Sequence, residues 1–197
     1  MMVTVVILAA GASSRLGLPK QNLVYQHITL LQHAVFNALQ VSANVIVVLG
    51  ANTGLIEPTI KDKPITILHN EDWANGMASS IQVAITHIQQ TQLRTNPVIL
   101  MLCDQPFADA KILNQLISEK NISKKGIIAS AYKNALGVPV LFDVTYFSQL
   151  LLLRGQDGAK VLLKQFLGDV QAVPFDLGVV DIDTLEDWER LLNKTHN

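Results

Sequence analysis

Short runs of consecutive aliphatic residues alternate along this chain with longer stretches in which hydrophobic residues recur every three or four positions. The runs predict buried strands, because they show no polar face to solvent. They lie at Val3–Leu8, Val45–Leu49, Ile65–His69, Val98–Leu102, Ile127–Ala131 and roughly Val170–Val173. The periodic stretches predict helices at Leu31–Leu39, Met77–Gln90, Asp109–Lys120, Val144–Leu153, Gly158–Phe166 and Thr184–Leu192.

This alternation of strands and helices predicts an α/β fold with a mostly parallel sheet and helices on both of its faces. In such sheets, ligands bind outside the carboxyl ends of the strands. Most polar clusters of this sequence follow directly after a predicted strand, so we expect the functional site there. No repeat or linker interrupts the 197 residues, and we expect a single domain over residues 1–197.

Composition narrows the class of function. Hydrophobic residues make up 49% of the chain and charged residues 16%, which is typical of a globular protein. The net charge of -1 argues against a broad nucleic-acid surface, although it permits a local cationic pocket. No apolar run approaches the roughly 18 residues of a membrane span, and the apolar start lacks the basic region of a secretion signal. We therefore expect a cytoplasmic protein that binds neither nucleic acid nor membrane.

The single cysteine, Cys103, excludes an internal disulfide and any multi-cysteine metal site. We expect no nearby cation to lower its pKa, and therefore a small buried residue and not a nucleophile.

The stretch LAAGASSRLGLPK, residues 8–20, has the composition of an anion-binding loop. Gly11 and Gly17 permit sharp turns and close approach to the backbone amides, while Arg15 and Lys20 supply cations that suit a polyphosphate. The dinucleotide motif G-x-G-x-x-G is absent. The phosphate-binding motif G-x-x-x-x-G-K-[ST] is also absent, because five residues and not four separate the two glycines. An ordinary turn with solvated cations is the alternative interpretation.

Two acidic clusters could hold a divalent cation. Asp104 ends an apolar strand in LMLCDQP, where a carboxylate would face the ligand crevice and suit Mg²⁺. Asp181 and Asp183 in DIDTLEDW alternate around one residue and would share a face if extended. A turn-forming Asp-x-Pro and two solvated carboxylates are the alternatives. Thr184 and Asp187 instead fit a helix-capping pattern.

The stretch HNEDWANGMASSI, residues 69–81, joins a strand to a helix. Gly76, Met77 and Ser80 would border a base pocket at the helix N-terminus, whereas Ser79 and Ser80 would otherwise cap that helix. For Trp73 we favour a lid over the core above a platform for a ligand.

Two later stretches contain glycine next to polar or rigid residues. In GVPVLF (137–142) we expect a rigid turn before an apolar run, and in RGQDGAK (154–160) a glycine-rich loop that opens a helix and suits an anion. Their candidate residues are Gly137, Pro139, Gly155, Asp157, Gly158 and Lys160.

The order of these motifs resembles the MobA-like NTP transferase family, and within it the MocA-like molybdenum cofactor cytidylyltransferases. The resemblance spans nearly the whole chain. Its motifs here are L-A-A-G-x-S-x-R-x-G-x-x-K, N-x-x-W-x-x-G-M-x-x-S-I, D-Q-P, G-x-P-x-L-F, G-x-D-G-A-[RK] and D-I-D-T-x-E-D. It implies a Rossmann-like three-layer nucleotidyltransferase fold and an enzyme that joins CMP from CTP to the phosphate of molybdopterin. Mg²⁺ would be the cofactor, and a recipient molybdoenzyme a further partner.

The resemblance also implies roles for individual residues. Arg15, Lys20 and Asp104 would be catalytic, and Asp104, Asp183 and Asp181 would hold the metal. The nucleotide would be bound by Leu8, Ala9, Ala10, Gly11, Ser13, Arg15, Lys20, Gly76, Ser80 and Asp104. The acceptor would be bound by Gly137, Pro139, Gly155, Asp157, Gly158 and Lys160.

Ala10 bears on the choice of base. Guanylyltransferase relatives usually carry L-A-G-G, and a methyl group at this position would crowd a purine more than a pyrimidine, which favours CTP. Lys160 stands where arginine is common in the family, and a point charge cannot make a bidentate contact to phosphate.

Two alternatives remain open from the sequence. One is an NTP transferase that acts on a sugar or polyol phosphate. The other is a non-catalytic protein that carries or inserts the cofactor. The second alternative implies a vestigial nucleotide site, which would be expected to lose some of its charged residues. All four are present: Arg15, Lys20, Asp104 and Asp183.

Overall fold

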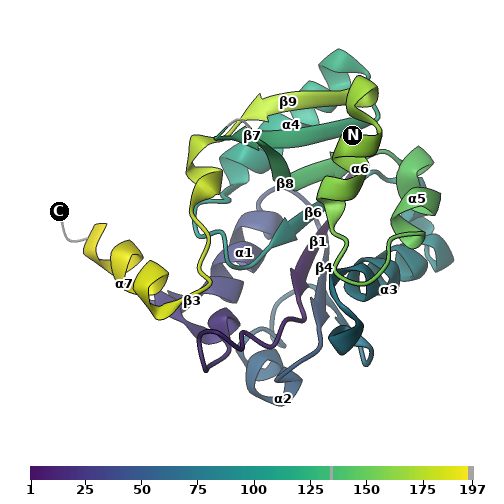
Figure 1. The fold of residues 1–197 in the computed structure, drawn as a ribbon. Coiled ribbons are helices and arrows are strands. Elements are labelled where there is room, and N and C mark those ends of the chain that lie inside the picture. The colour runs from purple at the N-terminus through teal and green to yellow at the C-terminus, as the bar shows by residue number, and fades with distance from the viewer. Residues whose placement is uncertain (134, 195–197) are drawn as a thin grey trace.

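The fold is built on one seven-stranded sheet, seen in a computed structural model that describes residues 1–133 and 135–194 (Figure 1). The strand order is β5-β4-β1-β6-β8-β7-β9, and only β8 runs antiparallel to its neighbours. The strands are β1 (Thr4–Ala9), β4 (Asn44–Leu49), β5 (Thr66–His69), β6 (Val98–Leu102), β7 (Ile127–Tyr132), β8 (Ala135–Phe142) and β9 (Val170–Pro174). The predicted mostly parallel sheet is confirmed.

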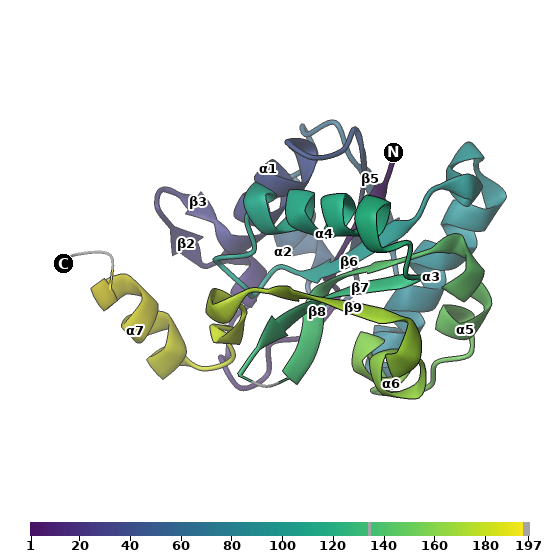
Figure 2. The same cartoon turned by 90° about the horizontal axis from the view of Figure 1, so that it is seen from above.

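Helices cover both faces of the sheet (Figure 2). On β1, Val5 and Ile7 face the layer of α1 and α4, whereas Val6 and Leu8 face α3, α5 and α6, since neighbouring side chains in a strand point to opposite faces. The helices of these layers are α1 (Leu30–Leu39), α2 (Thr53–Ile56), α3 (Met77–Gln90), α4 (Ala110–Ser123), α5 (Phe147–Leu151) and α6 (Ala159–Gln165). The structure therefore has three layers, as predicted.

Local sequence signals account for several helix ends. Asp109 caps α4, because its Oδ1 accepts a hydrogen bond from Ile112 N at 3.1 Å. The expected cap of α7 (Leu185–Lys194) is also present, since Thr184 and Asp187 exchange side-chain-to-backbone hydrogen bonds. The alternative that serines cap α3 is wrong: Gly76 occupies that position and no side chain caps it.

The prediction of a rigid turn at Gly137 and Pro139 is wrong. Both residues lie inside β8, between β6 and β7. A proline removes one hydrogen-bond donor from a strand and is tolerated at an irregularity. Here the pairing of β7 with β8 shifts register between Ala129 and Ser130, and the Ser130 hydroxyl donates to the Pro139 carbonyl at 2.7 Å. Glycine and proline concealed the strand in the sequence.

The C-terminal helix α7 packs on a small hydrophobic cluster of its own, beside the short hairpin of β2 (Val24–Tyr25) and β3 (Ile28–Thr29). Leu16 of the loop after β1 and Ile182 before α7 belong to this cluster. Ile182 N also donates to Asp104 O at 3.0 Å, so the segment before α7 is fastened to the end of β6. Figures 1 and 2 show α7 projecting from the sheet on the side of this hairpin.

Among the residues that the structure describes, no helix combines the length and apolar character that crossing a membrane requires.

Candidate active site

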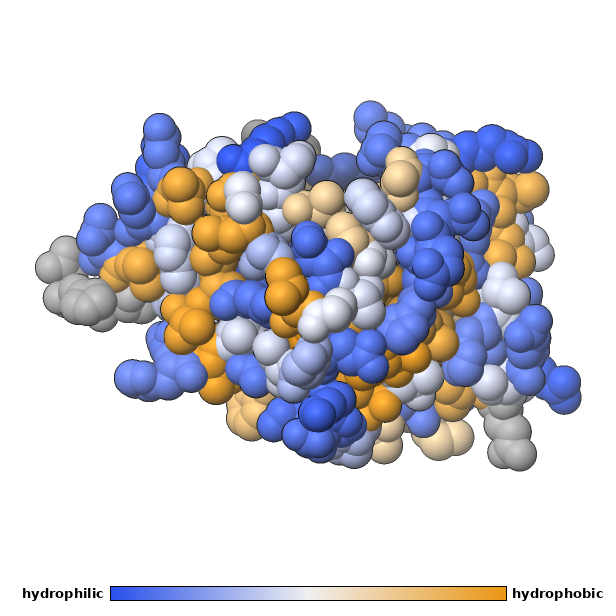
Figure 3. Space-filling view, turned by 90° about the horizontal axis from the view of Figure 1, so that it is seen from below, coloured by the Kyte–Doolittle hydropathy of each residue, from blue (hydrophilic) through white to orange (hydrophobic). Residues whose placement is uncertain are grey.

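The predicted site residues gather at the carboxyl ends of β1 and β6. The loop of residues 10–20 leaves β1 there, Asp104 follows β6, and Asp183 arrives from the segment before α7. Figure 3 shows this edge of the molecule, the lower one in Figure 1, where hydrophobic and hydrophilic residues are interspersed and no single kind dominates. The rule for parallel sheets predicts a ligand at this edge, and these predicted residues meet there.

Gln21 fixes the start of the loop after β1 by hydrogen bonds to its backbone. This residue was not predicted from the sequence. Gln21 is only 1% exposed, and its Nε2 donates to Ala9 O at 2.8 Å and to Gly11 O at 3.0 Å. Ser13 Oγ accepts a hydrogen bond from Lys20 N at 3.1 Å. The backbone N–H groups of residues 11–14 make no hydrogen bond to other described parts of the chain, which leaves them available to an anion.

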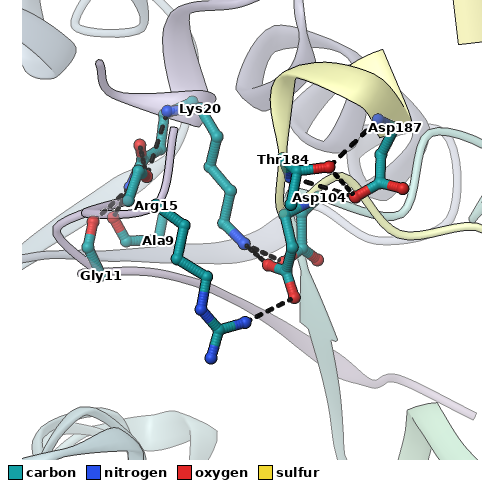
Figure 4. A network of polar contacts seen from close by, with 10 residues as sticks. Ala9, Gly11, Arg15, Lys20, Asp104, Thr184 and Asp187 are labelled. Carbon is teal, nitrogen blue, oxygen red and sulfur yellow. Dashed lines mark hydrogen bonds and ion pairs between the residues drawn. The ribbon is translucent and has the colours of Figure 1, made fainter. Parts of the chain in front are cut away.

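Lys20 crosses from this loop to two carboxylates (Figure 4). Its Nζ donates to Asp104 Oδ2 at 2.5 Å and to Asp183 Oδ1 at 2.9 Å. The Arg15 guanidinium lies 3.8 Å from the other oxygen of Asp183, and its side chain is 78% exposed. The loop and both acidic clusters thus meet at one point, with a second, largely exposed cation beside them.

Burial and charge act together on this group. Burial raises the pKa of the Asp104 carboxyl, the carboxylates of Asp183 and Asp181 add to this effect, and Lys20 opposes it. Burial alone would lower the pKa of Lys20, but Asp104 and Asp183 outweigh it and raise that pKa. Lys20 is therefore held as a cation.

Cys103 is buried beside the same group. Burial raises the pKa of its thiol to about 12, and the neighbouring Lys20 lowers it only in part. A thiol with this pKa is not a nucleophile near neutral pH, as predicted, although the expectation that no cation lies nearby is wrong.

A cavity of about 380 Å³, here named the loop cavity, lies against the opening loop. It includes Ala10 and Ser80, and Asn70 orients Ser80 by donating from Nδ2 to Ser80 Oγ at 2.9 Å. Of the predicted nucleotide-binding residues, Ser13 and Arg15 alone lie outside the lining. The lining residues are Leu8, Ala9, Ala10, Gly11, Ala12, Ser14, Lys20, Gln21, Trp73, Ala74, Gly76, Met77, Ser80, Leu102, Cys103, Asp104 and Gln156.

Trp73 belongs to this cavity and not to the core, so the expectation of a lid over the core is wrong. Its side chain is 37% exposed. A Cβ on Gly50 would lie 2.6 Å from Trp73 Cβ and 2.9 Å from Ala10 Cβ. Glycine at position 50 thus allows Trp73 and Ala10 to stand side by side along one wall.

A second cavity of about 520 Å³, named the Tyr132 cavity, adjoins the first. The two share Met77, Leu102, Asp104 and Gln156. The remaining lining residues are Gln105, Tyr132, Val138, Asp157, Gly158, Ala159, Lys160, Val161, Gly178, Val179 and Asp181. Asp104 therefore stands on the wall between two cavities.

Some of the predicted acceptor-binding residues line the Tyr132 cavity, and one of the others supports its wall. Asp157, Gly158 and Lys160 line the Tyr132 cavity, and Asp181 does so as well, without contacting Lys20. Gly155 lies outside the lining and supports it, because its carbonyl accepts a hydrogen bond from Ala78 N at 3.1 Å.

Gly137 and Pro139 do not line this cavity. Val138, which stands between them in β8, does.

The carboxylates suit a divalent cation that is completed by substrate. Asp104 Oδ1 is buried and has no hydrogen-bond partner among the described residues. Two carboxylates with phosphate oxygens are the ligands that Mg²⁺ ordinarily takes. In the described part of the chain no three His, Cys, Asp or Glu side chains cluster as a metal site. Asp104 and Asp183 would therefore hold such a cation together with phosphates.

Comparison with known protein families finds a match over most of the chain. The MobA-like NTP transferase domain matches residues 5–171. The chain belongs to this family. It is thus a member of a nucleotidyltransferase family, with the three-layer fold predicted for it.

Relatives of this MobA-like protein carry different names. It is 32% identical to the nicotine blue oxidoreductase of Paenarthrobacter nicotinovorans over 205 residues, 96% of each chain. It is 29% identical to the molybdenum cofactor cytidylyltransferase of Escherichia coli (strain K12) over 186 residues, 93% of this chain and 92% of that one. The Mycobacterium tuberculosis H37Rv protein Rv0371C, solved in complex with manganese, has a TM-score of 0.81 at 28% identity and covers 98% and 99% of the two chains.

Proposed function

We propose that this MobA-like protein joins CMP from CTP to the phosphate of molybdopterin and releases pyrophosphate, acting in the cytoplasm as one domain of residues 1–197. The observation that carries the proposal is Lys20, which bridges Asp104 and Asp183 beside a loop of free amides. These groups stand where two cavities meet. A relative named molybdenum cofactor cytidylyltransferase, at 29% identity, supports the general nucleotidyltransferase activity.

The reaction requires one bond to form and one to break. An oxygen of the acceptor phosphate attacks the α-phosphorus of CTP, and the bond between this phosphorus and the bridging oxygen of the β-phosphate breaks. The electron pair leaves with pyrophosphate. No side chain acts as nucleophile, so the protein contributes positioning and charge stabilisation.

The opening loop would bind the triphosphate. Its amides and the ammonium of Lys20 would stabilise the negative charge that develops on the leaving pyrophosphate. Arg15, exposed and near Asp183, would reach the outer phosphates. When bound by Asp104 and Asp183, Mg²⁺ supplies Lewis-acid stabilisation of phosphate charge.

The base would lie in the loop cavity. Ala10 and Trp73 stand along one wall, and Ser80 presents a hydroxyl that Asn70 holds in place. The Ala10 methyl leaves less room than glycine would, which favours a pyrimidine. The acceptor would occupy the Tyr132 cavity, and a recipient molybdoenzyme would take up the product.

The deciding experiment is a panel of nucleotides and acceptors. The purified protein is incubated with CTP or GTP, Mg²⁺ and molybdopterin, and both pyrophosphate and the mass of the product are measured. We expect the cytosine dinucleotide and pyrophosphate. Transfer only to a ribose or erythritol phosphate would contradict the acceptor, and CTP binding without pyrophosphate would indicate a non-catalytic carrier.

The relative at 32% identity requires one more arm, because its name describes an oxidoreductase. The same preparation is mixed with nicotine blue and a reduced nicotinamide or flavin, and the absorbance of the dye is followed. We expect no change in this assay. Turnover of the dye together with failure of CMP transfer would replace the proposed activity.

A further inference from the structure

Tyr132 stands in the second cavity with space made for it by two glycines. A side chain on Gly137 would overlap the Tyr132 hydroxyl. A Cβ on Gly178 would lie 2.7 Å from Tyr132 Cδ1. The ring is therefore seated between two stretches of backbone, β8 on one side and the segment after β9 on the other.

A buried side chain also holds the backbone beside the ring. Gln105 is buried, and its Nε2 donates to Gly178 O at 2.9 Å, which fixes the backbone beside Tyr132. Burial raises the pKa of the Tyr132 hydroxyl, while the Gln105 side chain acts against this effect from close by. A ring held in this way loses little freedom when a ligand packs on it.

The walls around Tyr132 combine a hydrocarbon part with polar side chains, among them Gln105, Gln156, Asp157, Lys160 and Asp181. Hydrocarbon side chains of Met77, Leu102, Val138 and Val161 line this cavity. Hydroxyl groups buried against them without partners would lose their hydrogen bonds to water, at a cost of roughly 1–3 kcal/mol each. The face of a flat heterocycle gains by contact with the hydrocarbon part, and an aromatic wall adds a favourable stacking geometry.

We propose that Tyr132 is a specificity-determining residue for the acceptor, and that its ring stacks on a planar heterocycle whose phosphate lies toward Asp104. This inference rests on the proposed function and narrows its acceptor to phosphates that carry a flat ring. Asp104 lies on the wall that the two cavities share, and the acceptor phosphate must meet the nucleotide there. The phosphate of the acceptor would therefore point from the Tyr132 cavity toward Asp104.

The kinetic test compares Tyr132→Leu, which removes the ring, with Tyr132→Phe, which keeps it. Initial rates of pyrophosphate release are measured while molybdopterin and CTP are varied in turn. We expect Tyr132→Leu to raise the KM for molybdopterin about tenfold and leave the KM for CTP unchanged. Tyr132→Phe should stay within about threefold of wild type. An acceptor KM unchanged in Tyr132→Leu, or raised together with that for CTP, would overturn the inference.

A binding measurement separates this inference from the proposed function. Pterin fluorescence is titrated with wild type and both variants, and ribose 5-phosphate is titrated by calorimetry. We expect pterin to bind wild type and Tyr132→Phe, to bind Tyr132→Leu about tenfold more weakly, and ribose 5-phosphate not to bind. If pterin shows this binding pattern while CMP transfer fails, the contact with Tyr132 is supported and the proposed reaction is wrong. If wild type binds only ribose 5-phosphate, or binds neither, the inference is wrong.

Discussion

Lys20 and Asp104 lie 84 positions apart in the chain, yet the Lys20 ammonium is 2.5 Å from the Asp104 carboxylate. Both side chains are largely buried, at 18% and 11% exposure. A buried ion pair of this kind contributes little net stability, because desolvation offsets the attraction between its charges. We therefore interpret the ion pair as functional: it would keep a cation and a carboxylate in position for a phosphate substrate.

Replacement of Lys20 by methionine should abolish turnover without unfolding the protein. The variant keeps the length of the side chain but loses the charge that stabilises the leaving pyrophosphate, and we expect at least a roughly hundredfold fall in kcat. Circular dichroism checks the fold, and Lys125→Met is a matched control because its ammonium donates to Gly168 O and the residue lines neither cavity. Full activity of Lys20→Met would contradict the proposed role of Lys20 in the transfer mechanism.

Lys20 and a divalent cation compete for the same two carboxylates, which leads to a prediction about metal binding. Without nucleotide, Lys20→Met should bind Mn²⁺ more tightly than wild type, since Asp104 and Asp183 lose their bound ammonium. Free Mn²⁺ is counted by electron paramagnetic resonance. Asp104→Asn in the same background should remove the gain. Equal affinity in wild type and Lys20→Met would show that the metal sits elsewhere.

Gly50→Ala should weaken CTP binding through the wall of the loop cavity. The added Cβ would push Trp73 or Ala10 toward the base, since neither can keep its present distance. We expect the Kd for CTP, measured by calorimetry, to rise about tenfold, the result of a loss of about 1.4 kcal/mol. Gly54→Ala serves as control, because a Cβ there meets no atom within 4 Å. Similar affinities in the two variants would contradict this account of the wall.

Ala10→Gly should relax the choice between CTP and GTP. Removal of the methyl group widens the loop cavity beside Ser80, so the ratio of kcat/KM for GTP to that for CTP should rise several-fold. Ala12→Gly, in the same loop, controls for added backbone freedom. A ratio that does not move in Ala10→Gly would show that the base is selected by other groups.

Asp169 gives a pH dependence of stability that is independent of catalysis. The Tyr146 hydroxyl donates to its Oδ2 at 2.7 Å and Gly126 N donates to its Oδ1 at 3.1 Å, and these bonds lower the pKa of the carboxyl. Because the native pKa lies below the unfolded value of about 3.9, the stabilisation is complete above that value and is lost as pH falls through the native pKa.

The matching experiment is urea unfolding of wild type and Asp169→Asn. At pH 7 we expect the variant to be less stable by roughly 1 kcal/mol, and the difference to shrink as the pH falls below about 4. A difference of the same size at pH 7 and at pH 3 would mean that charge on Asp169 is not its source.

Much of the fold was predictable because hydrophobic periodicity is a local property. The bounds of α3 and β6 agree with the prediction, and β1 is displaced by one residue. The missed strand β8 shows the limit of such patterns. Gly137 and Pro139 are locally typical of a turn, and only pairing with β6 and β7 makes that segment a strand. Tertiary contacts override local preference there.

For the candidate site, the residue types and their order along the chain determined the chemistry that we propose: a glycine-containing loop suited to an anion, two cations, and carboxylates after strands. This follows because glycine, lysine and aspartate carry their conformational freedom and charge wherever they stand. Distance between side chains far apart in sequence is not encoded locally. Only the tertiary structure joined Lys20 to Asp104 and Asp183, placed Gln21 under the loop, and enclosed Tyr132 between two glycines, because these contacts arise when the layers pack.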